Sequence, residues 1–235
     1  MKYSVKVNEV KNKEGNVRGF ATLVFGDSFK INNIAILENI ERSQLFVSMP
    51  RYRSNERDEN GGIIYKDICN PITAEFREEL YDYILEAYEK VVSQDKEQQK
   101  VGEKAESEMP EFSVTVTPYE REGSNVKGLA RIYFEDSFIV NNISILQGKE
   151  NVFVAMPAYK TKQTDGQGKA IYQDVCYPVT KEFREKLYSE IMDVYEQEKE
   201  KQQEQTKENG QEKDKESSQS QEQFQTAAKQ EMPFR

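Results

Sequence analysis

The chain has 235 residues, of which 36% are hydrophobic and 32% charged, and its formal net charge is −9. It contains no histidine, which removes the commonest general base, the Ser-His-Asp and Cys-His nucleophile systems and histidine metal sites, so we expect no enzymatic activity, no cofactor and no metal. The first 20 residues lack an apolar run with a cleavage site, and no window approaches the roughly 20 apolar residues of a membrane span, so we expect a cytoplasmic protein without membrane contact.

The first part of the chain predicts a series of short strands. Apolar and polar side chains alternate there with period two, which is typical of half-buried strands. Five strands are predicted, at residues 3–10, 17–25, 28–37, 45–49 and 63–68. Turns are predicted at residues 11–16 and at Gly26-Asp27. Residues 51–62 are polar and charged and end in Gly-Gly, so we expect them to form a long exposed loop at the tip of a β-ribbon.

After Pro71 the period changes to three or four residues, which predicts an amphipathic helix. Thr73 is the predicted N-cap, and Glu75 falls in the first turn, where the helix dipole favours a negative charge. The apolar positions of this helix are Phe76, Leu80, Ile84, Ala87 and Val91. Such a helix needs a sheet against which it can bury its apolar stripe, so the pattern indicates a small α+β domain.

The whole pattern then occurs a second time. Residues 45–53, LFVSMPRYR, return as residues 152–160, VFVAMPAYK. Residues 25–37 and 64–73 return in the same order as residues 134–146 and 171–180. The second helix is predicted from residue 180 to about 197, with Phe183, Leu187, Ile191 and Val194 on one side. The repeat therefore predicts an α+β chain of two tandem domains, each a small antiparallel β-sheet followed by an amphipathic helix.

Composition sets the predicted boundaries. The first repeat covers residues 1–92 and the second covers residues 111–197, separated by a Gln/Glu/Lys-rich linker at residues 93–110. Residues 198–235 are Gln/Glu/Lys-rich and nearly free of apolar side chains, so they cannot bury enough surface to offset their chain entropy and are expected to be disordered. Cys69 and Cys176 occupy equivalent places in the two repeats, and we expect them to be buried apolar residues rather than a disulfide or reactive thiols.

The repeated segments carry a family resemblance. The order of FGDSFKINNIAIL, LFVSMP and IYKDICNPIT in the first repeat, and of FEDSFIVNNISIL, VFVAMP and IYQDVCYPVT in the second, resembles the SpoVG family of bacterial septation and sporulation regulators. The resemblance implies a small α+β domain that dimerises and binds DNA and RNA as a regulator without catalysis. Because each repeat resembles one whole family domain, the tandem chain is expected to pack as an internal pseudo-dimer.

The resemblance also places the expected binding residues. The family's basic residues after Met-Pro map onto Arg51 and Arg53 in the first repeat, and onto Lys160 with the more distant Lys162 in the second. This chain departs from the family pattern at Ala158, which stands where the first repeat has Arg51, and at the two tyrosines that occupy a place often basic in the family. Together with neighbouring cations and aromatic rings, which suit phosphates and bases, the candidate nucleic-acid-binding residues are Arg51, Tyr52, Arg53, Arg57, Arg77, Tyr159, Lys160, Lys162, Lys169 and Arg184.

Charge leaves two alternatives open. No segment is strongly basic, since the net charge is −2 for residues 1–92 and −3 for residues 111–196, so binding to DNA or RNA must come from a local patch. The alternative is a protein-interaction or scaffolding module, in which the charged hairpins only keep the chain soluble and the acidic, Gln-rich tail contacts a protein partner. Arg77 and Arg184 begin the two predicted helices near the same end of each domain, so they could extend the patch or equally pair with glutamates at neighbouring turns. An exposed edge strand could also pair two chains.

Overall fold

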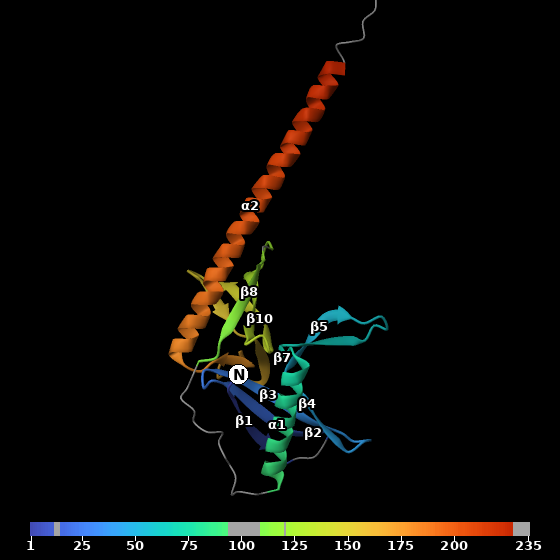
Figure 1. Cartoon of the computed structure of the whole chain (residues 1–235), viewed down its shortest axis with the longest axis vertical. Helices are drawn as coiled ribbons and strands as arrows, with labels where there is room; N and C mark the ends of the chain where they lie inside the picture. Colours follow the sequence, from blue (N-terminus) through green and yellow to red (C-terminus); the bar gives the residue numbers. More distant parts are fainter. Residues whose placement is uncertain (12–14, 94–108, 120, 228–235) are drawn as a thin grey trace, which may run out of the picture.

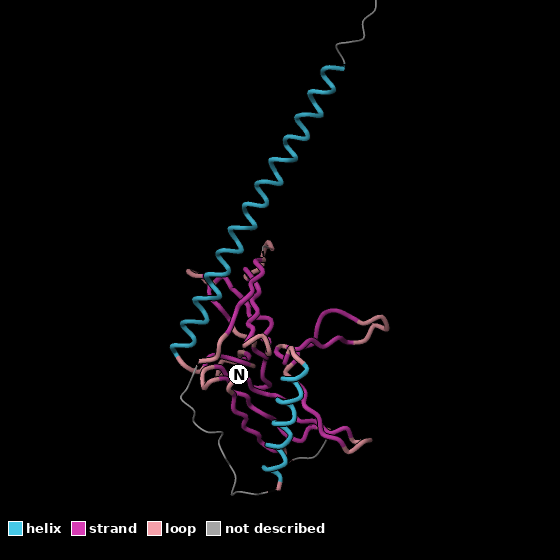
Figure 2. Tube along the Cα trace, viewed as in Figure 1, coloured by secondary structure: helices cyan, strands magenta, loops and turns pink. Residues whose placement is uncertain are grey.

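A computed structural model describes the backbone of residues 1–11, 15–93, 109–119 and 121–227 and the side chains as far as residue 204. It shows two β-rich halves, each followed by a helix (Figures 1 and 2). The predicted α+β class with tandem repeats is therefore confirmed. The predicted linker, residues 93–110, falls almost entirely outside the described residues. Among the helices described, none is long and apolar enough to cross a membrane.

The first repeat contains seven strands and a helix. In chain order these are β1 (Tyr3–Glu9), β2 (Val17–Phe25), β3 (Phe29–Asn39), β4 (Gln44–Ser48), β5 (Arg51–Arg57), β6 (Ile63–Asp67), β7 (Cys69–Pro71) and α1 (Ala74–Val92). The period-two alternation of β2 is confirmed, because Ala21, Leu23 and Phe25 are buried while the residues between them are not. The second repeat has the same order: β8 (Phe112–Pro118), β9 (Val126–Phe134), β10 (Phe138–Gln147), β11 (Val152–Ala155), β12 (Ala158–Thr164), β13 (Ala170–Asp174), β14 (Cys176–Pro178) and α2 (Lys181–Ala227).

The prediction of a long loop at residues 51–62 is wrong for its first seven residues. Arg51–Arg57 forms β5, which pairs with β6 in an antiparallel ribbon that projects from the body of the molecule (Figure 1). Only the tip is a turn, where Asp58 Oδ1 accepts hydrogen bonds from the backbone N–H groups of Asn60 (2.9 Å) and Gly62 (2.6 Å). The strand escaped prediction because β5 is almost fully exposed and so lacks the apolar alternation of a half-buried strand.

The helix start is confirmed and the apolar stripe needs one correction. Thr73 Oγ1 accepts a hydrogen bond from the Phe76 N–H (3.3 Å), as an N-cap should. The last buried position of α1 is Tyr88 instead of Val91, which is 37% exposed. The reason is Gly19 of β2, where an added Cβ would lie 3.2 Å from the Tyr88 ring, so the missing side chain makes room for the ring. In the second repeat Tyr195 occupies the matching position over Gly128.

Helix α2 is longer than predicted. It extends to Ala227, well past residue 197, where the sequence predicts the start of a disordered tail. Gln, Glu and Lys are good helix formers, whereas the prediction of disorder rested on the lack of apolar side chains, which excludes a packed core but not a helix. Among the side chains described, the last buried one of α2 is Tyr195. Residues 228–235 lie outside the described residues, and the domain boundaries stay predictions.

The two repeats exchange their short seventh strands. β7 of the first repeat pairs with β10, and β14 of the second pairs with β3. Cys69 lies opposite Val140, and Cys176 lies opposite Ile31. Backbone hydrogen bonds extend each exchange, from the Asn141 N–H to the Ile68 carbonyl (2.7 Å) and from the Asn32 N–H to the Val175 carbonyl (2.8 Å). Each main sheet is therefore completed by a strand from the other repeat.

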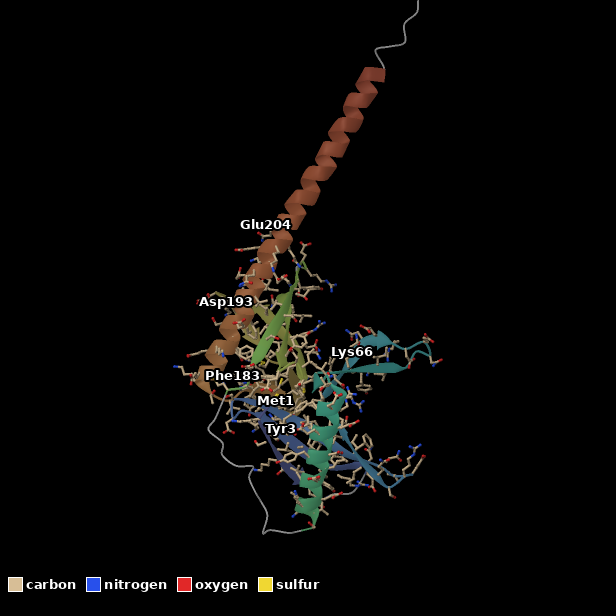
Figure 3. The ribbon with its side chains drawn as sticks, viewed as in Figure 1. Met1, Tyr3, Lys66, Phe183, Asp193 and Glu204 are labelled. Atoms are coloured by element: carbon tan, nitrogen blue, oxygen red, sulfur yellow. The ribbon has the colours of Figure 1, made fainter. Side chains whose placement is uncertain are left out.

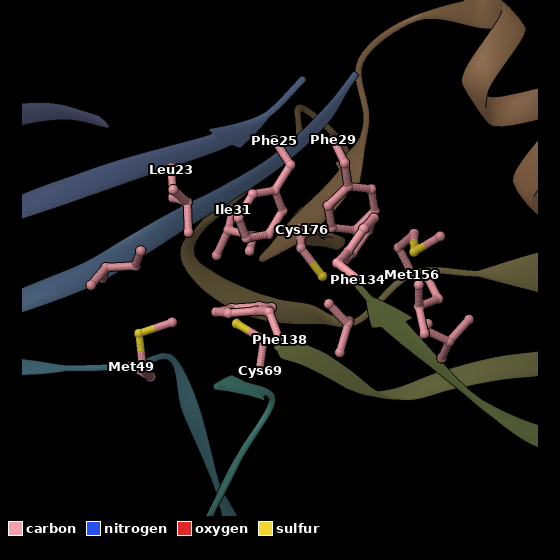
Figure 4. Packing of buried hydrophobic residues seen from close by; sticks show 14 of the residues in the cluster. Leu23, Phe25, Phe29, Ile31, Met49, Cys69, Phe134, Phe138, Met156 and Cys176 are labelled. Atoms are coloured by element: carbon pink, nitrogen blue, oxygen red, sulfur yellow. The ribbon is translucent and has the colours of Figure 1, made fainter. Parts of the chain in front are cut away.

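An aromatic cluster joins the repeats between the two exchanges (Figure 4). The ring of Phe25 lies 5.2 Å from that of Phe134 and 5.1 Å from that of Phe138, and the rings of Phe29 and Phe134 are 5.0 Å apart. The helices reach the same cluster, since Phe76 of α1 contacts Phe138 and Phe183 of α2 contacts Phe29. One core therefore spans both repeats. That this packing reproduces a dimer of two family domains stays a prediction.

The two cysteines lie in this core, as expected. Cys69 and Cys176 are free thiols and fully buried, and Figure 4 shows both beside the phenylalanine cluster. Burial raises the pKa of each thiol well above its ordinary value of 9.0, because an apolar environment disfavours the thiolate.

The buried thiols predict a loss of stability at alkaline pH. The folded state keeps both thiols neutral, while the unfolded chain releases their protons as the pH rises through 9.0. The contribution of the neutral thiols to the free energy of unfolding is therefore fully present below pH 9.0. Above this pH the free energy of unfolding falls by up to about 1.4 kcal/mol per pH unit for each thiol. In urea titrations between neutral pH and about pH 10.5, the C69A/C176A variant should show a shallower alkaline decline than the wild type. If the free energy of unfolding fell equally steeply with pH in both proteins, the buried thiols would not be the cause of the decline.

Candidate nucleic-acid interface

The three arginines of β5 lie on one face of the β5–β6 ribbon. In an antiparallel pair, directly opposite residues share a face, and so do residues two apart on one strand. The register pairs Arg51 with Asp67, Arg53 with Tyr65 and Arg57 with Ile63. All six side chains are exposed. We call the surface formed by Arg51, Arg53, Arg57 and Tyr65 the arginine face.

Tyr65 is a member of this surface that sequence reasoning missed. The Arg51 Cζ lies 5.6 Å from the centroid of the Tyr65 ring, which is a cation–π contact. Tyr65 is 54% exposed, so its ring stays accessible beside the guanidinium. The Tyr-x-Asp spacing was the available signal, because it places Tyr65 and Asp67 on one face of β6, opposite the strand that begins at Arg51.

The sequence grouped Tyr52 with its neighbouring arginines, and the structure separates them. Tyr52 lies opposite Lys66 on the other face of the ribbon. There Lys66 Nζ donates to Glu56 Oε1 at 2.5 Å, and this bond raises the pKa of Lys66. Figure 3 labels Lys66 on the projecting ribbon. One face of the ribbon thus carries three arginines against a single acid, Asp67, while on the other face Lys66 is paired with Glu56.

The second ribbon, β12–β13, does not repeat the arginine face. Its register pairs Ala158 with Asp174, Lys160 with Tyr172 and Thr164 with Ala170. The positions equivalent to the three arginines therefore hold Ala158, Lys160 and Thr164. Lys162 falls in the register shift between Lys160 and Thr164. Lys169 lies at the turn, where its N–H donates to Asp165 Oδ1 (2.8 Å). At these three equivalent positions the second ribbon therefore has one cation, Lys160, and the first ribbon has three.

Tyr159 lies on the opposite face of the second ribbon from Lys160. Its hydroxyl donates to Gln173 Oε1 (2.7 Å) and accepts from Asn33 Nδ2 (3.1 Å). Asn33 belongs to β3 of the first repeat, so Tyr159 is held at a contact between repeats. No local sequence pattern predicts this contact, because it depends on the pairing of β14 with β3.

Arg77 and Arg184 have the same local role in the two repeats. Arg77 Nη2 donates to the Pro71 carbonyl (3.4 Å), and Arg184 Nη2 donates to the Pro178 carbonyl (3.3 Å). Each arginine thus connects the first turn of its helix to the exchanged strand before it, through a backbone carbonyl rather than a glutamate. Arg77 also lies near Tyr81, whose pKa burial raises and the Arg77 charge partly lowers.

A sequence model of the SpoVG family matches residues 1–90 and again residues 109–197. The chain belongs to the SpoVG family. The two matches correspond to the two β-rich halves with their helices, so each half contains one of the two-stranded ribbons, β5–β6 in the first and β12–β13 in the second.

Individual SpoVG proteins align over less than one such domain. The septation protein SpoVG of Treponema denticola is 30% identical over 74 residues, which is 32% of this chain and 73% of that protein. That of Phytoplasma australiense is 36% identical over 73 residues, 31% of this chain and 70% of its own length. That of Clostridium beijerinckii is 34% identical over 71 residues, 30% of this chain and 71% of its own length. Family membership and these names support a SpoVG-like regulator.

Proposed function

We propose that this chain is a non-catalytic, nucleic-acid-binding regulator of the SpoVG type, in which the arginine face of β5–β6 binds the phosphate backbone of DNA or RNA. The observation that carries the proposal is the placement of Arg51, Arg53 and Arg57 on one exposed face with Tyr65. Arginine suits this task because its planar fork forms charge-assisted, bidentate hydrogen bonds to phosphate oxygens.

The geometry of the strand supports contacts to several phosphates. Arg51 and Arg53 are two residues apart on β5, which separates their backbones by about 6.7 Å. Their side chains can therefore reach different phosphates of one strand. Tyr65 adds a ring that can pack against a sugar or a base. Because the chain as a whole carries a net charge of −9, attraction to a polyanion is confined to this local surface, and we expect modest affinity that depends strongly on salt.

The second candidate function is protein interaction without nucleic-acid binding. It is favoured by apolar side chains exposed on the sheets away from the helices. The first sheet exposes Phe20 and Phe46, and the second exposes Leu129 and Phe153. These residues lie at matching positions of the two repeats, so both sheets offer a similar apolar surface to a protein partner.

Salt dependence distinguishes the two functions. The wild-type chain should bind fluorescent oligonucleotides, measured by anisotropy, with an affinity that falls between about 50 and 200 mM salt. Three arginine contacts predict a slope of log affinity against log salt of about −2 to −3, since each phosphate contact contributes about −0.7 to −0.9. Single- and double-stranded DNA and RNA are compared in parallel. If no form binds at low salt, the proposal is wrong and protein interaction becomes the favoured function.

A further inference from the structure

A second surface of interest lies where β14 of the second repeat enters the sheet of the first. Tyr177 of β14 lies directly opposite Lys30 of β3, and Lys30 Nζ is 5.9 Å from the centroid of the Tyr177 ring. Both side chains are partly exposed. They belong to different repeats, so the pair depends on the strand exchange.

Tyr159 extends this surface toward the second ribbon. Its hydroxyl is held between Asn33 Nδ2 and Gln173 Oε1, while its side chain stays 39% exposed. Asn33 adopts a left-handed backbone conformation, with φ of 61°, at a register shift in β3. Ile31 and Ile34 on either side of this bulge are fully buried. Lys30 and Asn33 therefore lie on the outer face of β3, so the two contacts are on the same face of the first sheet.

We call this the junction surface, and it consists of Lys30, Asn33, Tyr159, Gln173 and Tyr177. It combines two partly exposed aromatic rings with one cation and two side-chain amides. Each amide has hydrogen-bonding groups beyond the one that holds Tyr159. The two bonds to the Tyr159 hydroxyl fix the position of its ring, so little side-chain freedom is lost when another flat group packs against it.

The equivalent surface in the other half of the molecule is chemically different. There β7 pairs with β10, and Asn70 lies opposite Ile139 where the junction surface has Tyr177 and Lys30. Lys66 replaces Gln173 and is bonded to Glu56. The two repeats thus differ both in their ribbons and at the surfaces beside them. The first ribbon has the arginines, and the base of the second ribbon has Tyr159 and, beside it on the first sheet, Tyr177 with Lys30.

We propose that the junction surface binds unpaired bases of single-stranded nucleic acid, with Tyr159 and Tyr177 as stacking platforms and Lys30 contacting an adjacent phosphate. The proposal rests on the proposed function and adds a preference to it. Arginines that contact only phosphates bind single and double strands alike, whereas stacking on tyrosine requires a base that is free of its duplex neighbours. The chain should therefore prefer single strands, through a site to which both repeats contribute.

The test compares full-length wild-type protein with the Y159L/Y177L variant. The probes are a uridine-rich RNA, a thymidine-rich single-stranded DNA and a duplex DNA of equal length. The variant should lose affinity for the single strands by about 10-fold per ring removed, and its affinity for the duplex should stay within about twofold of wild type. Y172L is the matched control, because Tyr172 is 65% exposed on the opposite face of the same ribbon. It should bind every probe as the wild type does.

A second measurement avoids the risk that the double variant folds poorly. Wild-type protein is photocrosslinked to an iodouridine-containing RNA and to the matching DNA, and the modified peptides are mapped by mass spectrometry. Crosslinks at Tyr159 or Tyr177 support the proposal. Crosslinks confined to the first ribbon, or single-strand affinity unchanged in Y159L/Y177L, would overturn it while leaving the arginine face in place. Failure of the wild type to bind any probe would overturn both proposals.

Discussion

Replacement of Arg51, Arg53 and Arg57 together by glutamate is expected to reduce oligonucleotide affinity by roughly 10³-fold. A charge-assisted hydrogen bond contributes about 1.5 kcal/mol, and three of them correspond to about three factors of ten. The substituted carboxylates also repel the phosphates. The fold should be preserved, because the three side chains are exposed and project from a ribbon that lies outside the core. Anisotropy titrations at constant salt measure the loss, and circular dichroism checks the fold.

The control must separate the arginine face from net charge. Lys6, Arg42 and Lys149 are exposed cations outside both ribbons, and their replacement by glutamate changes the charge of the chain by the same amount. This variant should lose much less affinity than the arginine variant. The converse variant, A158R/T164R, places arginines at the equivalent positions of the second ribbon and should bind more tightly than wild type. Equal losses in the two glutamate variants would show that binding is diffuse and that the arginine face is not the site.

Truncation of one phenylalanine in the second repeat is expected to destabilise the first. Phe138 is fully buried and contacts Phe25 and Phe76 across the repeat boundary. Phe138→Ala should lower the free energy of unfolding by about 3–5 kcal/mol, from the lost burial and the cavity it leaves. Because one core spans both repeats, amides of β2 and β3 should exchange faster although the substitution lies in the other repeat. Urea denaturation and hydrogen exchange measure the two effects.

Phe153→Ala is the matched control for this experiment. It removes the same side chain from the same repeat, but Phe153 is 48% exposed on β11. Its cost should stay near the ±0.5 kcal/mol of ordinary surface substitutions. If Phe138→Ala left exchange in the first repeat unchanged, the two repeats would be independent folding units despite their shared strands.

Local signals accounted for much of the fold. The alternation of residues 17–25, the Thr73 cap and the stripe of Phe76, Leu80 and Ile84 each have a short-range cause, so one sequence was enough to place them. The error at Val91 has a longer-range cause. Helical spacing permits either Tyr88 or Val91 in the last turn, and the choice is made by Gly19, which lies on a strand far away in the chain.

The candidate site was less predictable because its geometry also depends on contacts between residues far apart in the chain. Sequence reasoning found the arginines but treated residues 51–62 as a loop, in which neighbours such as Tyr52 seem to act together. Pairing with β6 reverses this grouping, because adjacent residues of a strand point to opposite faces. The contact between Asn33 and Tyr159 was out of reach, since it requires knowledge of which repeat completes which sheet.

The exchanged strands also bear on how the chain folds during synthesis. β3 is made early, but β14, which completes its sheet, begins only at Cys176. At about 5–20 residues per second, the ribosome needs roughly 7 to 27 s after completing β3 to reach β14. During that interval the nascent first repeat presents an unpaired edge and the uncovered rings of Phe25 and Phe29. The second repeat must therefore be made before this edge and these rings can be buried.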